Sequence, residues 1–400
     1  MDHPRTPDPL PGEYLWPRRK WLQQFGTAAL VTGISAVSRQ ARADESPPSE
    51  LDASYIYDCP ELIEITAPGP IIRPDGTSVC SWSRRPYLDL NFEDARFYSI
   101  PYFQRYRLKK WDMYHLATPD HYLSFLVAWI GYGAFGTAYV YDRKSKTGSE
   151  EFHLRLPRPE NPMMRNSDQG RTEYLGRKGK IVFEVEGESR QIRVDFPSFA
   201  GVGLKAAIDL HLPAGHESVC ATHLTNPRRS HYSHKINCMT ARGELELGKK
   251  SFRLDPENSF GMLDFGRGYY PPKLFWYWAT ASGRDAKGKL VGWNLGYGNS
   301  PVQTNENALF YDGRLHKIGQ VKCQVPEDLM QPWRVWSEDG RVDLTLVPEN
   351  VRFSDLKIGG LYSIGRPALG LYSGAIILDS GEKISLPEIF GLFEWFNQKW

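Results

Sequence analysis

One stretch of the chain combines an acid, an arginine and a cluster of aromatic rings within a few residues. It runs from Phe260 to Ile318 and begins FGMLDFGRGYYPPKLFWYWATASG. A carboxylic acid among buried rings can keep its proton near neutral pH, because desolvation raises its pKa. Tryptophan faces stabilise a nearby cation by roughly 0.5 to 2 kcal/mol. Asp264 with Trp276 and Trp278 could therefore protonate a carbon–carbon double bond, as a hydratase or isomerase must.

This candidate site has a catalytic and a structural interpretation, and the sequence leaves both open. In the catalytic one, Asp264 is the acid and His316, which follows a turn, is a general base. In the structural one, an arginine within ~4 to 6 Å keeps the aspartate charged, so that Asp264 and Arg267 pin a turn. The candidate ligand-binding residues are Arg267, Tyr269, Tyr270, Trp276, Trp278, Asn294, Asn305 and Glu306.

The tryptophans and the polar residues of this list each have two possible roles. Side chains alternate along a strand, so Trp276 and Trp278 share a face. There they either line a ligand cavity or fill the core of a barrel. Asn305 and Glu306 either orient the polar end of a ligand or belong to a solvated loop.

The elements that must position these residues are strands. Apolar and polar residues alternate over residues 204–211 and 341–346, as in half-buried strands of an antiparallel sheet. Turn signals that end in glycine separate such runs, at Asp75-Gly76, Glu186-Gly187, Asp312-Gly313, Asp339-Gly340 and Ser380-Gly381. Several strands at hairpin spacing predict a sandwich or a barrel.

Two apolar stretches could be helices. Residues 122–141 carry no charge and are as long as a membrane-spanning helix. Three clustered glycines and a high content of aromatic and β-branched residues predict two buried strands there instead. A C-terminal helix after Pro387 is predicted from the helical spacing of Ile389, Leu392, Phe393, Phe396 and Trp400.

The first 43 residues have the pattern of a cleaved export signal. Arg18-Arg19-Lys20-Trp21-Leu22 precedes a short apolar run and then Ala41-Arg42-Ala43, the order typical of a twin-arginine (Tat) signal. We expect the Tat export machinery to recognise it, cleavage after Ala43, and a periplasmic or otherwise exported protein. The remaining chain is divided into a spacer over 44–77, an N-terminal β domain over 78–235 and a C-terminal β domain over 236–400, with a linker near 226–235.

Composition and missing motifs exclude several function classes. The chain has 49 basic and 47 acidic residues, a balance without an electrostatic footprint for nucleic acid. It has no Gly-x-Ser-x-Gly elbow, no Walker-type loop and no complete dinucleotide fingerprint. We therefore expect no cofactor and no metal. Contact with a membrane is compatible with the sequence, whereas an integral span is not expected.

Five cysteines would meet oxidising conditions after export. Cys220 with Cys238 is the first disulfide candidate, because the segment between them can turn back on itself. Buried thiols are an equally good interpretation.

Several longer motifs resemble a bacterial family known as domain of unknown function 2804. They are CSWSRRPYLDLN, RLKKWDMYHL, DFGRGYYPPKLFWYWATASG, NENALFYDGRLHKI and GLYSGAIILDSGEKISL, and the resemblance covers most of residues 78 to 400. More remotely, the chain is similar to the carotenoid 1,2-hydratase group, which has two lipocalin-like barrels and an Asp-His-Glu-Trp-Gly motif. Asp264 and Gly268 match the ends of that motif, while Phe265, Gly266 and Arg267 replace its centre.

The resemblance implies an all-β protein of two tandem antiparallel lipocalin-like (calycin-type) barrels. The function expected is binding of a hydrophobic or amphipathic small molecule, such as a lipid or an isoprenoid, with hydratase or isomerase chemistry at Asp264 as its enzymatic form. Two alternatives are a carbohydrate-binding or carbohydrate-active β protein, which the many Trp and Tyr residues suggest, and a structural envelope protein without catalysis.

Overall fold

The computed structural model describes residues 63–97, 100–156, 162–226, 229–298 and 305–399. The chain divides into two compact units, residues 1–46 and 47–400, and every described residue belongs to the second unit. The predicted export signal over 1–43 and most of the predicted spacer lie outside the described residues. No helix in the described part of the chain is long and apolar enough to cross a membrane.

The first large sheet has the strand order of an up-and-down barrel. Its path runs β7-β6-β5-β4-β15-β13-β11-β10-β9-β8, with all neighbours antiparallel. In chain order, β4 is the first strand of this path and β15 is the last, and these two strands pair with each other. The two ends of the path, β7 and β8, do not pair. The strands are β4 (Leu108–Ala117), β5 (His121–Trp129), β6 (Ala134–Asp142), β7 (Thr147–Arg155), β8 (Gln169–Leu175), β9 (Lys180–Glu186), β10 (Ser189–Phe196), β11 (Leu204–His211), β12 (Val219–Asn226), β13 (Arg229–Leu247), β14 (Lys250–Leu254) and β15 (Phe260–Tyr269).

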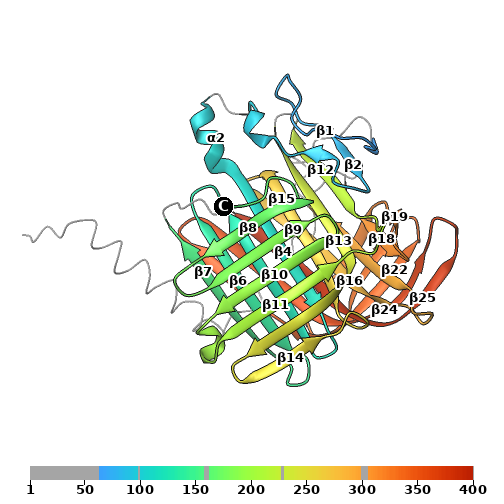
Figure 1. The fold of residues 1–400 in the computed structure, drawn as a ribbon. Coiled ribbons are helices and arrows are strands. Elements are labelled where there is room, and N and C mark those ends of the chain that lie inside the picture. The colour runs from blue at the N-terminus through green and yellow to red at the C-terminus, as the bar shows by residue number, and fades with distance from the viewer. Residues whose placement is uncertain (1–62, 98–99, 157–161, 227–228, 299–304, 400) are drawn as a thin grey trace, which may run out of the picture. The chain divides into compact units, whose positions relative to one another are not determined.

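The second large sheet repeats this arrangement with the rest of the chain. Its path runs β19-β18-β17-β16-β25-β24-β22-β21-β20, so first and last strands again pair and the interruption falls between β19 and β20. Figure 1 shows both sheets curling around their own cores. The strands are β16 (Lys273–Arg284), β17 (Leu290–Tyr297), β18 (Ala308–Tyr311), β19 (Arg314–Lys317), β20 (Val321–Gln324), β21 (Trp333–Ser337), β22 (Val342–Val351), β23 (Ser354–Ile358), β24 (Leu361–Ile377) and β25 (Lys383–Lys399). The predicted pair of lipocalin-like barrels is confirmed.

Short elements cover one end of the first barrel (Figure 1). They are β1 (Gly69–Pro70), β2 (Ser81–Ser83), β3 (Leu88–Asp89), the 3-10 turn η2 (Phe92–Asp94) and the helix α2 (Pro101–Arg107). Ile71, Leu90 and Phe92 from this region are buried in the first core. A further 3-10 turn, η3 (Phe199–Gly201), precedes β11.

The structure confirms one prediction about apolar stretches and corrects another. Residues 122–141 form β5 and β6, as expected. The predicted C-terminal helix is wrong, because residues 383–399 are the strand β25. Phe393 and Trp395 enter the second core, whereas Phe390 and Leu392 face the first barrel. A strand that is apolar on both faces has no period of two, so its spacing imitates a helix.

The chain passes from the first sheet to the second at a later residue than the domain boundary predicted from the sequence. A boundary between residues 235 and 236 falls inside β13, and the proposed linker near 226–235 overlaps the β12–β13 hairpin. The first sheet extends to Tyr269 and the second begins at Lys273. The turn over residues 270–272 therefore connects the barrels.

The disulfide suggested for Cys220 and Cys238 is also wrong. Both side chains are buried free thiols, and Cys323 is free as well. Cys80 is disulfide-bonded, and Cys59 lies outside the described residues.

The two barrels pack against each other through their outer faces. A separate apolar cluster joins strands of both sheets, and we call it the interface cluster; it consists of Ala117, Tyr122, Tyr139, Tyr141, Met262, Trp278, Leu369, Phe390 and Leu392. Alternation along β16 sends Tyr277 and Ala279 into the second core and Trp278 into this interface cluster. In the same way, β15 sends Leu263 into the first core and Met262 outward.

A β-bulge in β13 fixes the two barrels to each other. Its register against β15 shifts between Ile236 and Met239, and Cys238 has a φ of 62°. The side-chain amide of Asn237 donates to Thr280 Oγ1 and to the carbonyls of Ala281 and Trp293, each at 3.0 Å. Lys235 lies two residues before Asn237 on β13 and faces outward, toward the second barrel. The polar cluster described next is built around it.

Candidate functional site

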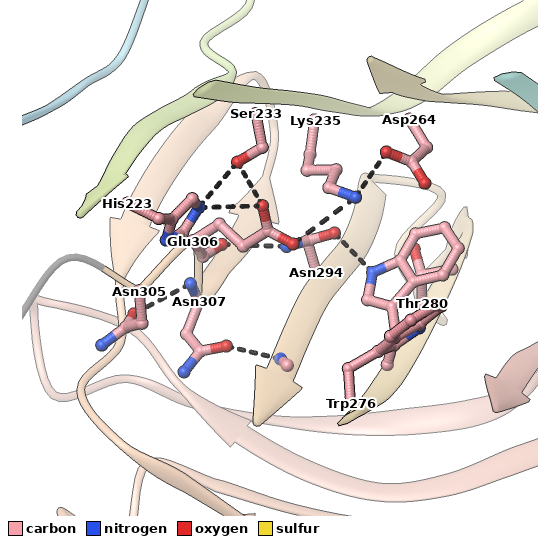
Figure 2. A network of polar contacts seen from close by, with 12 residues as sticks. His223, Ser233, Lys235, Asp264, Trp276, Thr280, Asn294, Asn305, Glu306 and Asn307 are labelled. Carbon is pink, nitrogen blue, oxygen red and sulfur yellow. Dashed lines mark hydrogen bonds and ion pairs between the residues drawn. The ribbon is translucent and has the colours of Figure 1, made fainter. Parts of the chain in front are cut away.

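An ammonium group held between two carboxylates forms the centre of the candidate site. Lys235 Nζ lies 2.6 Å from Asp264 Oδ1 and 3.4 Å from Glu306 Oε1 (Figure 2). Lys235 stands opposite Asp264 in the register of β13 and β15, while Glu306 precedes β18 of the second barrel. The side chains of Asp264 and Glu306 are 15% and 17% exposed, against 8% for Lys235. The carboxylates are therefore the more accessible part of the cluster.

Aromatic rings surround this charged centre. Trp111 Nε1 donates to Asp264 Oδ1 at 3.0 Å, and Lys235 Nζ lies 4.6 Å from the centroid of the Trp278 ring. Tyr270 packs on Trp111 with a centroid distance of 4.8 Å and on His231 at 4.1 Å. The site thus combines formal charges with apolar ring faces.

A serine and a histidine complete the side of the cluster near Glu306. Ser233 Oγ donates to Glu306 Oε2, and His223 Nε2 lies 3.0 Å from Ser233 Oγ and 3.7 Å from Glu306 Oε2 (Figure 2). His223 stacks on His231 at 4.7 Å. Burial lowers the pKa of His231 well below its ordinary value, so this ring of the stack is neutral at pH 7.

The charges of the centre stabilise one another. Burial acts to lower the pKa of Lys235, but the adjacent Asp264 and Glu306 carboxylates outweigh it, and the pKa is raised. Burial would raise the pKa of Glu306, but the charge of Lys235 and the hydrogen bonds from His223 and Ser233 hold it well below its usual range. Asp264 Oδ1 lies 2.6 Å from the same ammonium, so Lys235 pairs with a carboxyl group of each barrel.

Tryptophan side chains from β16 form the wall contributed by the second barrel. Trp278 Nε1 donates to Asn294 Oδ1 at 2.7 Å, and Asn294 Nδ2 donates to the carbonyl of Glu306 at 2.9 Å. Trp276 stacks on Phe396 with a centroid distance of 5.1 Å, and its Nε1 donates to Glu394 Oε1 at 3.1 Å. Asn294 therefore ties the Trp278 ring to the loop that carries Glu306.

The structure brings six of the predicted site residues together. Around Lys235 lie Asp264, Tyr270, Trp276, Trp278, Asn294 and Glu306. Asn305 is adjacent, and its Oδ1 accepts hydrogen bonds from Lys317 Nζ at 2.6 Å and from the backbone N–H of Asn307 at 2.9 Å. Its observed contacts therefore order the loop before β18.

The remaining predicted residues lie elsewhere. Arg267 and Tyr269 point into the first barrel, where Arg267 Nη2 bonds Asp112 at 2.6 Å and Tyr269 packs on Phe92. The alternative pairing of Asp264 with Arg267 is therefore wrong: residues three apart on a strand face opposite sides. His316 Nδ1 lies 3.1 Å from Asp379 Oδ2, on the β19 edge of the second sheet rather than in the cluster.

Sequence reasoning missed the residues that strand pairing adds. These are Trp111, His223, Ser233, Lys235 and Glu394. A signal existed for two of them, because Lys235 is the only Asp, Glu, Lys or Arg between Arg229 and Arg242, and Glu394 is the only one between Glu388 and Lys399. A lone charge in such a strand is costly to bury unless it has a partner.

The charged centre does not favour a metal ion. Among the residues that the structure describes, no group of three or more His, Cys, Asp or Glu side chains could hold one. Lys235 Nζ already occupies the position between Asp264 and Glu306 where a cation would bind.

Gly266 provides a test of how the Trp111 ring is positioned. A Cβ at this glycine would lie 2.3 Å from Trp111 Cε2, so Gly266→Ala should displace the indole from Asp264. We expect a loss of about 1 to 3 kcal/mol of stability from overpacking, with a changed near-ultraviolet circular dichroism spectrum. Gly319→Ala is the control, because nothing lies within 4 Å of its Cβ position. Equal effects of the two changes would contradict this packing.

Comparison with known proteins gives a family match and distant structural similarity. The family model described as "Domain of unknown function (DUF2804)" matches residues 62–400. The crystal structure of CghA with Sch210972 is 10% identical, with a TM-score of 0.47 over 73% of this chain and 88% of that one. Kievitone hydratase from Nectria haematococca is 9% identical, with a TM-score of 0.42 over 73% and 88%. No curated protein matches. At these identities and scores, no residue role is transferred from either structure.

Proposed function

The chain belongs to the domain of unknown function 2804 family, and we propose that this member binds an amphipathic small molecule between its barrels and transfers protons to and from it. The ligand class is a lipid or isoprenoid with a hydroxyl or carbonyl at one end. The reaction class is hydration or isomerisation of a carbon–carbon double bond, in which Asp264 accepts a proton.

The observation that carries this proposal is the ammonium of Lys235 between two partly exposed carboxylates and against the face of Trp278. Charged groups of both signs within hydrogen-bond reach can orient a ligand hydroxyl or carbonyl. The adjoining rings of Trp276 and Trp278 offer apolar surface to the body of the ligand. Small-molecule sites usually combine many apolar groups with a few polar ones.

The molecule that the protein carries when it is purified tests the ligand class. Mass spectrometry of organic extracts from the purified full-length protein should detect a bound lipid or isoprenoid. Titration with farnesol as a probe, followed by calorimetry, should then give saturable binding. A protein that carries no extractable lipid and binds no farnesol would contradict the proposed function.

Trp276→Ala should weaken the binding of farnesol while leaving the fold intact. Burying an aromatic side chain contributes about 1.5 to 3 kcal/mol, so we expect the Kd to rise roughly 10- to 100-fold. Trp336→Ala is the matched control, because Trp336 is also half-buried and lies on β21, away from the interface cluster. Calorimetry that shows equal affinities for the two variants would exclude Trp276 from the binding surface.

A further inference from the structure

Glu394 is a carboxyl group that the charged centre does not use. It lies on β25 directly opposite Trp278 in the strand register. Its neighbours Phe393 and Trp395 enter the second core, so Glu394 itself faces outward with Leu392, toward the first barrel. Trp276 Nε1 donates to its Oε1 at 3.1 Å. Within the described residues, the structure gives Glu394 Oε2 no hydrogen-bond partner.

The surroundings of Glu394 favour a neutral carboxylic acid. Burial raises the pKa of Glu394 to about 7, although the Trp276 hydrogen bond and the charge of Arg352 oppose the shift. Asp264 adds to the increase and Lys235 opposes it. Arg352 is itself bound to Glu150 Oε1 at 2.6 Å, which leaves its charge only partly available.

The other groups that face Glu394 are neutral. Tyr122 of β5 is close enough to be influenced by the Glu394 charge, and burial raises the pKa of this phenol well above its usual value. The phenol hydroxyl of Tyr122 lies 2.8 Å from His115 Nδ1 on β4, and burial lowers the pKa of His115 to about 3. Neither group carries charge at pH 7, so the ionisation of Glu394 is set mainly by burial and by the few charged side chains near it.

We propose that Glu394 is the proton donor of the site, acting on a double bond that lies over the Trp276 and Trp278 rings, with Asp264 as the matching proton acceptor. This role rests on the proposed function. The two carboxyl groups come from different barrels, one on β25 and one on β15. The arrangement assigns opposite tasks to two acids because one is held neutral and the other is paired with an ammonium.

The reaction needs water as its only co-reactant, and no oxidant or reductant takes part. The Glu394 carboxyl transfers its proton to one alkene carbon, whose π electrons form the new C–H bond and leave a cation on the other carbon. The ring faces of Trp276 and Trp278 stabilise that cation. Water adds through its oxygen and gives its extra proton to Asp264, which returns it to Glu394 through solvent. In the isomerisation, Asp264 instead takes a proton from the carbon next to the cation.

Infrared titration of the wild-type protein tests the protonation of Glu394 directly. We expect a carboxylic C=O band that disappears as the pH rises through about 7. The band should be absent in Glu394→Gln and retained in Glu388→Gln, since Glu388 is an exposed glutamate of the same strand. If the band is absent from the wild type at pH 6, or is unchanged in Glu394→Gln, Glu394 is not the acid.

Turnover in oxygen-18 water separates this role from the proposed function. Wild-type protein with farnesol should give a diol that contains one labelled oxygen, and Glu394→Gln should be slower by about 10²- to 10⁴-fold with its Kd for farnesol within a few-fold of wild type. Full turnover in Glu394→Gln would overturn the role of Glu394 and leave the proposed function standing. Wild-type protein that binds farnesol and neither hydrates nor isomerises it would overturn the chemistry as a whole.

Discussion

Lys235→Met should destabilise the protein by about 3 to 5 kcal/mol, the range observed when one partner of a buried ion pair is removed. The ammonium lies 2.6 Å from Asp264 and 3.4 Å from Glu306. Without it, two carboxylates face each other across the barrel interface and lose the cation that both contact. Urea unfolding at pH 7 measures the loss, and farnesol binding should fall because the polar end of the site collapses.

The stability difference between the wild type and Lys235→Met should depend on pH. In the wild type, the depressed pKa of Glu306 contributes stability above its unfolded pKa of about 4.3, and this contribution is lost as the pH falls through the lower folded value. In Lys235→Met, mutual repulsion raises the carboxyl pKa values in the folded state instead, so protonation stabilises the variant. The difference between the two proteins should therefore shrink from pH 7 to pH 4.

A surface ion pair gives the matched control for Lys235. Lys289 Nζ lies 2.9 Å from Asp312 Oδ2, with side chains 45% and 58% exposed. Lys289→Met should change the free energy of unfolding by at most about 1 kcal/mol, because solvent screens exposed pairs. If Lys235→Met costs no more than Lys289→Met, the ammonium does not hold the two barrels' carboxylates together.

The two-barrel fold could be predicted because its signals are local. Alternation along residues 204–211 and 341–346, with glycine turns between the runs, is enough to indicate antiparallel strands. The C-terminal segment could not be assigned in the same way. β25 is covered by the second core on one side and the first barrel on the other, so burial removed the alternation that identifies a strand.

The candidate site was predictable for residues that lie close together in the sequence, between Asp264 and Glu306, but not for those that strand pairing adds. Trp276 and Trp278 were correctly placed on a common face, because the period of a strand settles this. The pairing of Lys235 with Asp264 could not be predicted, because it depends on the register of β13 against β15. That register includes a bulge, and a shift of one residue would send Lys235 into the barrel core. Glu394 was missed for a similar reason, because the pairing of β25 with β16 brings it to Trp276.

Arg267→Met should cost about 3 to 5 kcal/mol of stability and leave ligand affinity unchanged, because the guanidinium lies inside the first barrel. Its side chain is 3% exposed and that of Asp112 is 0%. Arg267 Nη1 also donates to the Trp111 carbonyl at 2.7 Å, and Nη2 to the Met164 carbonyl at 2.9 Å. Thermal unfolding and farnesol calorimetry on the same sample separate these two effects.

Asp112 determines how the Arg267→Met defect varies with pH. Burial already raises the pKa of Asp112, and Arg267 opposes that shift; without the arginine the folded pKa rises further above the unfolded value. Such a group stabilises the fold below the unfolded pKa, and this stability is lost as the pH rises through the folded one. The defect should therefore be smaller at pH 5 than at pH 8. A defect independent of pH would indicate that lost packing on Phe265 is the main cause.

The double variant Asp112→Leu with Arg267→Met distinguishes a buried charge from a lost contact. Replacing both members of a buried pair by apolar residues is often close to neutral, so the double variant should be more stable than Arg267→Met alone. Arg165→Met is the surface control, because Arg165 and Asp89 are 46% and 48% exposed, and it should change stability by at most about 1 kcal/mol. A double variant that is less stable than either single one would mean that two sets of hydrogen bonds stabilise the barrel independently of the ion pair. These are the bond from the Thr172 hydroxyl to Asp112 and the bonds from Arg267 to the Trp111 and Met164 carbonyls.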